Sequence, residues 1–346
     1  MPPQASCLTR HPAPAGLARL HAFDHGRALG LVTTGRGAKW LALSPDGDTR
    51  TLWEGVRPEN ALAIGSPCGR LVAFALDGVV EVFDLSTQQR LHRLPLPSPR
   101  AVTSRLRWDT PNRLIVVTAE AEVRVWRPDD GTILAAWTAA MGEDVTTAGD
   151  ALPEDPPIFT EQQRSFEGWV GRLRRADDGA VVQEVCVPSP AHPSPFEAAE
   201  LTVRRGSLDL AASFLWADGA TRRSSLHLWR DGQHIPLGEL TCAAEPEERQ
   251  PIWDVQILTP GLVFTRGWAG CRVWDAETRT SREIPKLAGV SRDGLMLGRD
   301  DSVTDLKTGQ TTRLGEGGAT RGAISPDGRL VVLGRREALE WWTLTR

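Results

Sequence analysis

Residues 61–94, ALAIGSPCGRLVAFALDGVVEVFDLSTQQRLHRL, contain four short apolar runs separated by three groups of turn-forming residues. The breakers are Pro67-Cys68-Gly69, Asp77-Gly78 and Ser86-Thr87-Gln88. Short runs rich in Val, Phe and Leu between such breakers predict β-strands joined by tight turns. The stretch therefore predicts a four-stranded antiparallel meander. Because a meander of this size does not bury both of its faces alone, it also predicts neighbouring sheets of the same kind.

The end of the third run, VEVFDL, recurs along the chain as VRVWRP, LHLWRD, CRVWDA and LEWWTL. Three weaker copies extend the series. One aligned position per copy gives the set Ala42, Phe83, Trp126, Arg174, Trp229, Trp274, Thr304 and Trp342. The mean spacing is about 43 residues, and a four-stranded repeat of roughly 40 to 45 residues is the period of a propeller blade.

Turn tetrapeptides support this register. The first hairpin of three repeats carries SPCG at 66–69, SRDG at 291–294 and SPDG at 325–328. In SPCG and SPDG the Pro presets the backbone, and in all three turns Gly takes the left-handed position. Another SPDG, at 44–47, falls between the third and fourth strands of the first repeat.

The sequence thus predicts an all-β fold, a single β-propeller domain over residues 1–346 with four-stranded antiparallel blades. Eight blades are favoured, with seven as the alternative because one copy is short. The last copy has only three strands, and residues 5–11 precede a complete first repeat. We therefore expect the N- and C-terminal strands to pair, which would close the ring and protect open sheet edges. The repeats are predicted near 17–55, 59–96, 101–137, 144–188, 196–241, 250–285, 286–316 and 320–346, the last completed from 1–16.

Composition excludes several classes of protein. The 346 residues carry a formal net charge of -4, which predicts neither a nucleic-acid partner nor an acidic tail. No secretory signal and no apolar run of about 18 residues is present, so we expect a cytoplasmic protein with no membrane partner. The five cysteines are far apart and form no zinc or disulfide pattern. The chain has 40 Lys and Arg together, almost all of them Arg, a bias that indicates a GC-rich bacterial genome.

The segments GRLVAFALDGVVEVFDL, VRVWRP, CRVWDAET and AISPDGRLVVLGRREALEWWTL resemble blades of WD-repeat propellers, and the resemblance covers nearly the whole chain. The Gly-His dipeptide of that family is absent, and only Trp274-Asp275 gives the terminal Trp-Asp in register. This departure puts the family's His-Asp-Trp hydrogen-bond chain in doubt and marks a divergent member. The resemblance implies a protein-interaction platform, usually without catalysis.

Partner-binding residues are expected in the loops between blades and in the second-to-third hairpins, because loops on a rigid scaffold usually carry binding. Trp268, between glycines at a hairpin tip with Arg266 nearby, has the composition of an interface hot spot. The alternative is a Trp that covers the neighbouring blade. Further candidates for contact with a protein partner are Arg57, Arg100, Arg222 and Arg223. The partner is unidentified, and we expect a monomer or a subunit of a hetero-complex.

Motifs for chemistry are few. His227 and His234 are expected on different strands of one blade without a metal-ligand spacing, so packing or surface roles are favoured. No phosphate-binding Gly-rich loop and no nucleophile motif is present. We therefore expect no catalytic residue, no cofactor and no metal. The rival hypothesis is a propeller hydrolase or lyase with a site at the channel mouth, where Glu59, Asp144 and Asp254 would converge.

Overall fold

The computed structural model describes residues 2–23, 26–34, 37–55, 62–66, 70–76, 78–98, 101–110, 112–120, 122–138, 143–147, 158–165, 168–175, 180–188, 198–204, 209–244, 250–284, 287–291, 294–315, 317–325 and 327–345. Within these ranges every helix or strand element is a β-strand, and the strands form eight four-stranded sheets. Four of them follow one another along the first half of the chain. They are β2–β5 (Leu17–Phe23, Arg27–Thr34, Gly37–Leu43, Thr49–Gly55), β6–β9 (Leu62–Gly65, Leu71–Leu76, Val79–Asp84, Gln89–Pro95), β10–β13 (Thr103–Thr110, Arg113–Thr118, Glu122–Arg127, Thr132–Thr138) and β14–β17 (Glu143–Thr147, Ile158–Ser165, Gly168–Arg175, Val181–Pro188).

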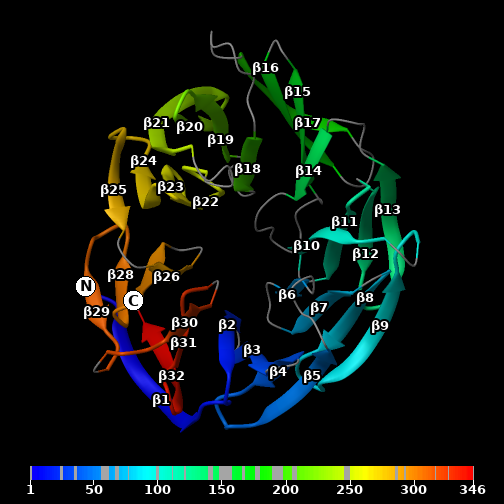
Figure 1. Cartoon of the computed structure of the whole chain (residues 1–346), viewed down its shortest axis with the longest axis vertical. Helices are drawn as coiled ribbons and strands as arrows, with labels where there is room; N and C mark the ends of the chain where they lie inside the picture. The colour runs from blue at the N-terminus through cyan, green and yellow to red at the C-terminus, as the bar shows by residue number, and fades with distance from the viewer. Residues whose placement is uncertain are drawn as a thin grey trace. The chain divides into compact units, whose positions relative to one another are not determined.

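The other four sheets include the one that contains both chain ends (Figure 1). They are β18–β21 (Ala198–Arg204, Asp209–Asp218, Thr221–Arg230, Gln233–Ala243), β22–β25 (Asp254–Thr259, Leu262–Gly267, Gly270–Asp275, Thr280–Ile284), β26–β29 (Leu287–Val290, Leu295–Gly298, Ser302–Asp305, Thr311–Arg313), and β30–β32 (Arg321–Ile324, Leu330–Gly334, Ala338–Thr345) with β1 (Gln4–Pro12). Successive strands are sheet neighbours, as in a meander. All eight aligned repeat positions fall on the third strand of their sheet, which confirms the predicted repeat register.

The strand β1 pairs antiparallel with β32, with Ala5 opposite Leu344 and His11 opposite Leu339. Figure 1 shows the two strands side by side. The side chains of Ser6 and Thr343 add a hydrogen bond of 2.8 Å between their hydroxyl groups. This is the pairing of the chain ends that the sequence predicts.

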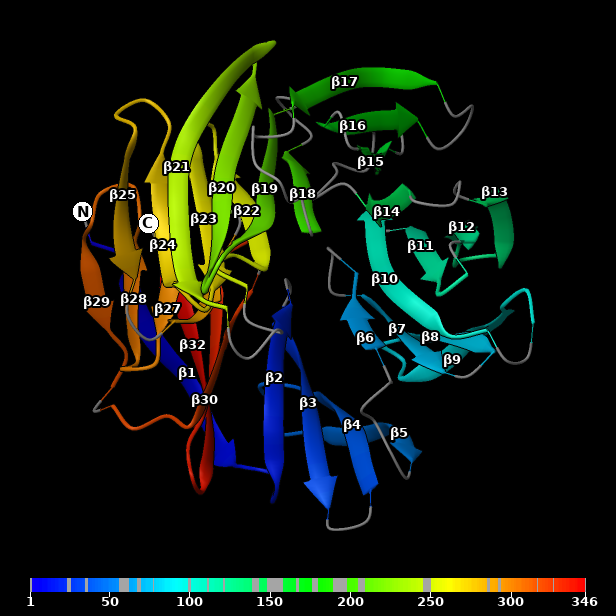
Figure 2. The same cartoon turned by 45° about the horizontal axis from the view of Figure 1, so that its top comes forward.

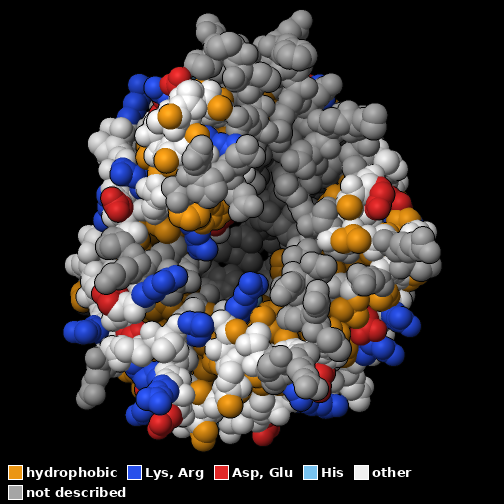
Figure 3. Space-filling model, viewed as in Figure 1, with side chains coloured by type: hydrophobic (Ala, Val, Ile, Leu, Met, Phe, Trp, Pro, Cys, Tyr) orange, Lys and Arg blue, Asp and Glu red, His pale blue; other side chains and the backbone are white. Residues whose placement is uncertain are grey.

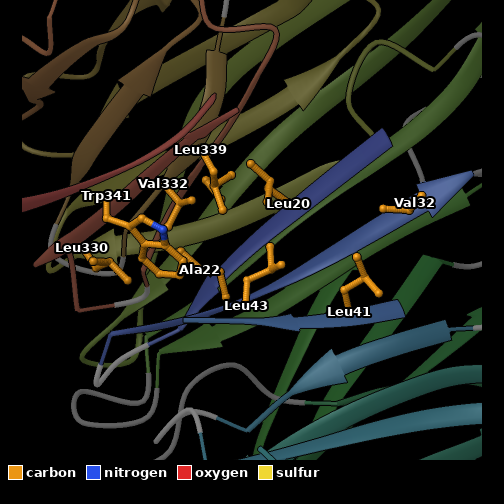
Figure 4. Close-up of a cluster of buried hydrophobic side chains, with 11 residues drawn as sticks. Leu20, Ala22, Val32, Leu41, Leu43, Leu330, Val332, Leu339 and Trp341 are labelled. Atoms are coloured by element: carbon orange, nitrogen blue, oxygen red, sulfur yellow. The ribbon is translucent and has the colours of Figure 1, made fainter. Parts of the chain in front are cut away.

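The chain divides into two compact units. Unit 1 consists of Met1–Pro111, Pro128–Gly131 and Lys286–Arg346, and unit 2 of Asn112–Arg127 and Thr132–Pro285. In unit 1 the sheet of β30–β32 with β1 packs against β2–β5 through a cluster that includes Leu20, Leu43 and Trp341, shown in Figure 4. Its opposite face buries Val331 and Leu333 against the sheet β26–β29.

Burial on both faces explains why the second strands are apolar without alternation. Leu330 and Val332 face one neighbour of β31 while Val331 and Leu333 face the other, so four consecutive residues are buried. The same reason gives the run LVAFAL in β7 its five buried residues. In unit 2, β19 buries eight consecutive residues, and Figure 2 shows it beside the long strands β20 and β21. A two-residue period is lost wherever both faces of a strand are covered.

The first-hairpin serines have one structural role. Ser66, Ser291 and Ser325 are fully buried, and each hydroxyl accepts a hydrogen bond of 2.9 Å from the backbone N–H at the start of the next strand. This confirms the predicted hairpins.

The turns between third and fourth strands share another set of hydrogen bonds. The carboxylates of Asp84, Asp275 and Asp305 each accept hydrogen bonds from the backbone N–H groups two and three residues later. Such side-chain bonds favour turns.

Candidate functional site

The hairpin between β23 and β24 carries Trp268 at its tip, as predicted. Gly267 and Gly270 close the hairpin as a pair, which leaves Trp268 and Ala269 as its two turn residues. The segment that leads into β22 lies along this hairpin. The N–H of Trp268 donates to Gln250 at 2.9 Å, and the N–H of Trp253 donates to the carbonyl of Arg266 at 2.9 Å. The backbone of both tryptophans is therefore fixed by hydrogen bonds.

Gly267 makes this approach possible. A Cβ atom at this position would lie 1.6 Å from the carbonyl oxygen of Pro251 and 2.8 Å from the Cα of Ile252. No side chain fits in that space, because both neighbours are backbone. Glycine at 267 is thus required for close contact between the hairpin and the residues before β22.

Two exposed indoles result from this arrangement. Trp268 is 55% exposed and Trp253 is 41% exposed. Their ring centroids are 6.3 Å apart at an interplanar angle of 78°, so they contact edge to face. This is a favourable geometry for an aromatic pair. More than half of the surface of Trp268 therefore faces solvent.

Arg266 lies two residues before Trp268 and directly opposite Asp254 in the β22–β23 ladder. Its Nε atom is 3.9 Å from Oδ2 of Asp254, and its guanidinium carbon lies 5.9 Å from the ring centroid of Phe264. Phe264 is fully buried, so it supports the arginine from below. Asp254, a candidate channel-mouth carboxylate in the sequence, thus acts here as the charge partner of Arg266. We name the surface of Trp253, Trp268 and Arg266 the Trp face.

Arg222 and Arg223 are the second and third residues of β20, which begins directly after the turn from β19. The Nη2 atom of Arg223 is 2.7 Å from Oδ2 of Asp218, and its Nη1 atom is 3.9 Å from Oε2 of Glu239. Its charge is therefore used within its own sheet. Arg222 stands opposite Ala217 and Cys242. Arg57, Arg100 and Glu59 lie outside the described residues, as does the side chain of Asp144.

The sequence missed the role of Trp253. It was visible only as an aromatic residue beside Asp254, in the motif PIWD ahead of a strand. The signal that identifies it is the contact with Trp268, which depends on how the chain before β22 meets a hairpin that follows it. A run of turn residues does not encode that contact.

A buried side-chain hydrogen bond links two strands of the sheet β22–β25. The indole N–H of Trp274 donates to Oγ1 of Thr265 at 2.8 Å, and both side chains are buried. Among the described residues no histidine side chain bonds to a carboxylate. The bond between Trp274 and Thr265 joins the second and third strands of the sheet.

His227 and His234 form a contact that their spacing did not indicate. Nδ1 of His227 is 2.8 Å from Nε2 of His234, and Nε2 of His227 is 2.9 Å from the hydroxyl of Ser225. The two imidazoles are nearly coplanar, and His234 stacks on Trp229 at 5.0 Å. Burial, followed by the neighbouring His234, lowers the pKa of His227 to about 4. Because the ring nitrogens point at each other, they share a hydrogen bond.

In the part of the chain that the structure describes, no three His, Cys, Asp or Glu side chains come close enough together to hold a metal ion. The described ranges also hold no helix with the length and apolarity of a membrane span.

Comparisons of the fold give WD40 β-propellers. The C-terminal WD40 domain of Sif2 matches with a TM-score of 0.56 and 12% identity over 99% of this chain and 99% of that chain. A chain of the mitotic checkpoint complex matches with a TM-score of 0.52 and 12% identity over 99% and 92%. The computationally designed Ika8 protein matches with a TM-score of 0.56 and 17% identity over 96% and 98%. No protein-family model matches the chain, and no curated protein sequence matches it. The likeness shows the fold: the chain resembles a WD-repeat β-propeller.

Proposed function

We propose that the chain is a non-catalytic scaffold that binds a protein partner through the Trp face, with Trp253 and Trp268 as apolar anchors and Arg266 as a flanking charge. The observation that carries this proposal is the exposure of two indoles whose backbones are held by hydrogen bonds. Exposed aromatic residues on a rigid support lose little conformational entropy on binding, and Trp and Arg are enriched among residues that dominate binding energy.

The proposal includes the finer features of the fold and setting. We infer one closed ring of eight blades in a single domain, completed by the pairing of β1 with β32. We also infer a cytoplasmic, bacterial protein that acts as a monomer or as a subunit of a hetero-complex, without cofactor. Arg222 and Arg223 would contribute to contact from the neighbouring sheet, and Arg57 and Arg100 from other loops.

Affinity purification with quantitative mass spectrometry tests the Trp face. The full-length chain is compared with the double variant Trp268→Ala and Arg266→Ala, and with a control double variant, Ile133→Ala and Arg279→Ala. The control removes one exposed apolar residue and one exposed arginine from the same unit. We expect a partner that is lost with the first variant and kept with the control, at equal thermal stability. Equal recovery of every partner by all three proteins would contradict the assignment.

A further inference from the structure

One edge of unit 1 gathers arginines from three neighbouring sheets. Arg299 and Arg336 lie in the second-to-third hairpins of the sheet β26–β29 and of the sheet β30–β32 with β1, respectively. Arg321 begins β30, and Arg19 lies near the start of β2. In a meander, the start of the first strand and the second-to-third hairpin share an edge. All four residues are exposed, and Figure 3 shows Lys and Arg side chains over β26, β30 and β2 on one face.

These arginines are not neutralised by the residues around them. Within the described ranges the side chains of Arg19, Arg299 and Arg336 make no hydrogen bond or ion pair. Arg321 donates to two backbone carbonyls, those of Ala18 at 2.6 Å and Thr320 at 2.7 Å, and to no carboxylate there. We name Arg19, Arg299, Arg321 and Arg336 the basic edge.

Among the described residues of this edge, the exposed carboxylates are Asp300 and Glu337. Asp300 accepts a hydrogen bond of 2.6 Å from the hydroxyl of Ser302, and its pKa is lowered by that bond, so it stays charged. Four arginines against two carboxylates leave a positive surplus, although the whole chain has a net charge of -4. The surplus is therefore a local feature of the edge.

The framework under the basic edge is rigid. Nη1 of Arg335 is 2.8 Å from Oδ2 of the buried Asp301, and its Nε is 2.8 Å from Oε1 of the buried Glu340. This ion network joins the hairpin of one sheet to that of the next. The N–H of Ala13 donates to the carbonyl of Glu337 at 3.1 Å and ties the chain before β2 to the same hairpin.

We propose that the basic edge binds an acidic peptide segment of a protein partner, which extends the scaffold function, on which it rests, to a second surface. A positive patch on a fixed framework favours anionic ligands through electrostatic complementarity. A short peptide fits better than a nucleic acid, because nucleic-acid binding usually neutralises several phosphates, and the negative charge of the rest of the chain opposes a long polyanion.

Fluorescence anisotropy with a short labelled peptide of alternating Glu and Ser tests this at low ionic strength. The variant Arg19→Gln, Arg299→Gln and Arg336→Gln removes three charges that make no internal bond, while Arg321 is kept because it holds Ala18. The control variant Arg50→Gln, Arg279→Gln and Arg329→Gln removes three exposed arginines elsewhere. We expect the first variant to bind the peptide about tenfold more weakly, and the control to bind within about twofold of the unchanged chain.

Three results would overturn the proposal: no peptide binding by the unchanged chain, equal weakening in both variants, or tighter binding of single-stranded DNA of equal charge. Trp268→Ala separates this site from the Trp face. We expect this variant to bind the peptide normally. The peptide measurement therefore tests the basic edge even if affinity purification finds no partner for the Trp face. Loss of peptide binding in Trp268→Ala would show that the two surfaces are not independent.

Discussion

Nδ1 of His227 lies 2.8 Å from Nε2 of His234, in two nearly coplanar rings. The pair holds one hydrogen between the two nitrogens, and Ser225 occupies the other nitrogen of His227. His227 contacts the ring of Phe214 edge to face and stacks with the ring of Trp229. A proton added to this cluster enters a largely apolar environment, which is why the pKa of His227 falls from 6.5 to about 4.

This shift predicts a pH dependence of stability. The unfolded chain takes up a proton at His227 near pH 6.5 and the folded chain only near pH 4, so the free energy of unfolding should decrease as the pH falls through that window. We expect a loss of about 3 kcal/mol, measured by denaturant unfolding. His227→Phe keeps the stacked ring without titration and should flatten the slope. An unchanged slope in His227→Phe, with His92→Gln as control, would disprove the role of His227.

Removal of Arg335 should strongly destabilise unit 1. Arg335→Ala leaves the buried carboxylates of Asp301 and Glu340 without their shared partner, so we expect a loss of about 3 to 5 kcal/mol in chemical denaturation. The matched control is the adjacent Arg336→Ala, which removes an exposed arginine and should change stability by less than about 0.5 kcal/mol. Similar losses in both variants would show that the ion network contributes little.

Thr265→Val tests the hydrogen bond between Thr265 and Trp274. The change keeps the shape of a β-branched side chain but leaves the buried indole N–H of Trp274 without an acceptor, at a cost of about 1 to 2 kcal/mol. Thr280→Val, at an exposed position in the same sheet, is the control and should be neutral. In Trp274→Phe the same threonine change should cost less. Additive effects of the two changes would mean that the residues do not act together.

Gly267→Ala should separate the two tryptophans. The added Cβ overlaps the carbonyl of Pro251, so the backbone hydrogen bonds made by Trp253 and Trp268 must lengthen. We expect the free energy of unfolding to fall by about 3 kcal/mol. Gly219→Ala meets nothing within 4 Å and pays only for its φ of +60°, about 1 kcal/mol. Hydrogen exchange of the amides of Trp253 and Trp268 measures the local effect. Full protection of both amides in Gly267→Ala would show that the close contact with Pro251 does not require glycine at this position.

Local patterns predicted the sheets because each blade is built from short-range contacts. Ser66, Ser291 and Ser325 mark their hairpins by bonds to residues four or five positions away. The aligned positions around Phe83 and Trp274 mark third strands, because the same core environment recurs in each sheet. Alternation of polar and apolar residues does not mark β19, because both faces of this strand are buried.

Contacts between particular side chains were not predicted from the sequence. Arg335 reaches Asp301 across 34 positions, and no local pattern pairs one of many arginines with one of many acids. His227 and His234 meet because the ladder between β20 and β21 shifts its register between Leu226 and His227, a bulge that no turn signal announces. For the same reason Trp253 gained significance only from the packing of its segment against Gly267.

The ladder between β1 and β32 joins residues that are 337 positions apart, as at Ser6 and Thr343. During synthesis β1 leaves the ribosome long before β32 exists, and the edge of β1 stays unpaired until β32 has been made. We expect the final sheet to assemble last and slowly, since such a large loop must close first. In a circular permutant, the two ends are joined by a peptide bond and the chain begins at an exposed turn elsewhere. In that protein the sheet would form during translation.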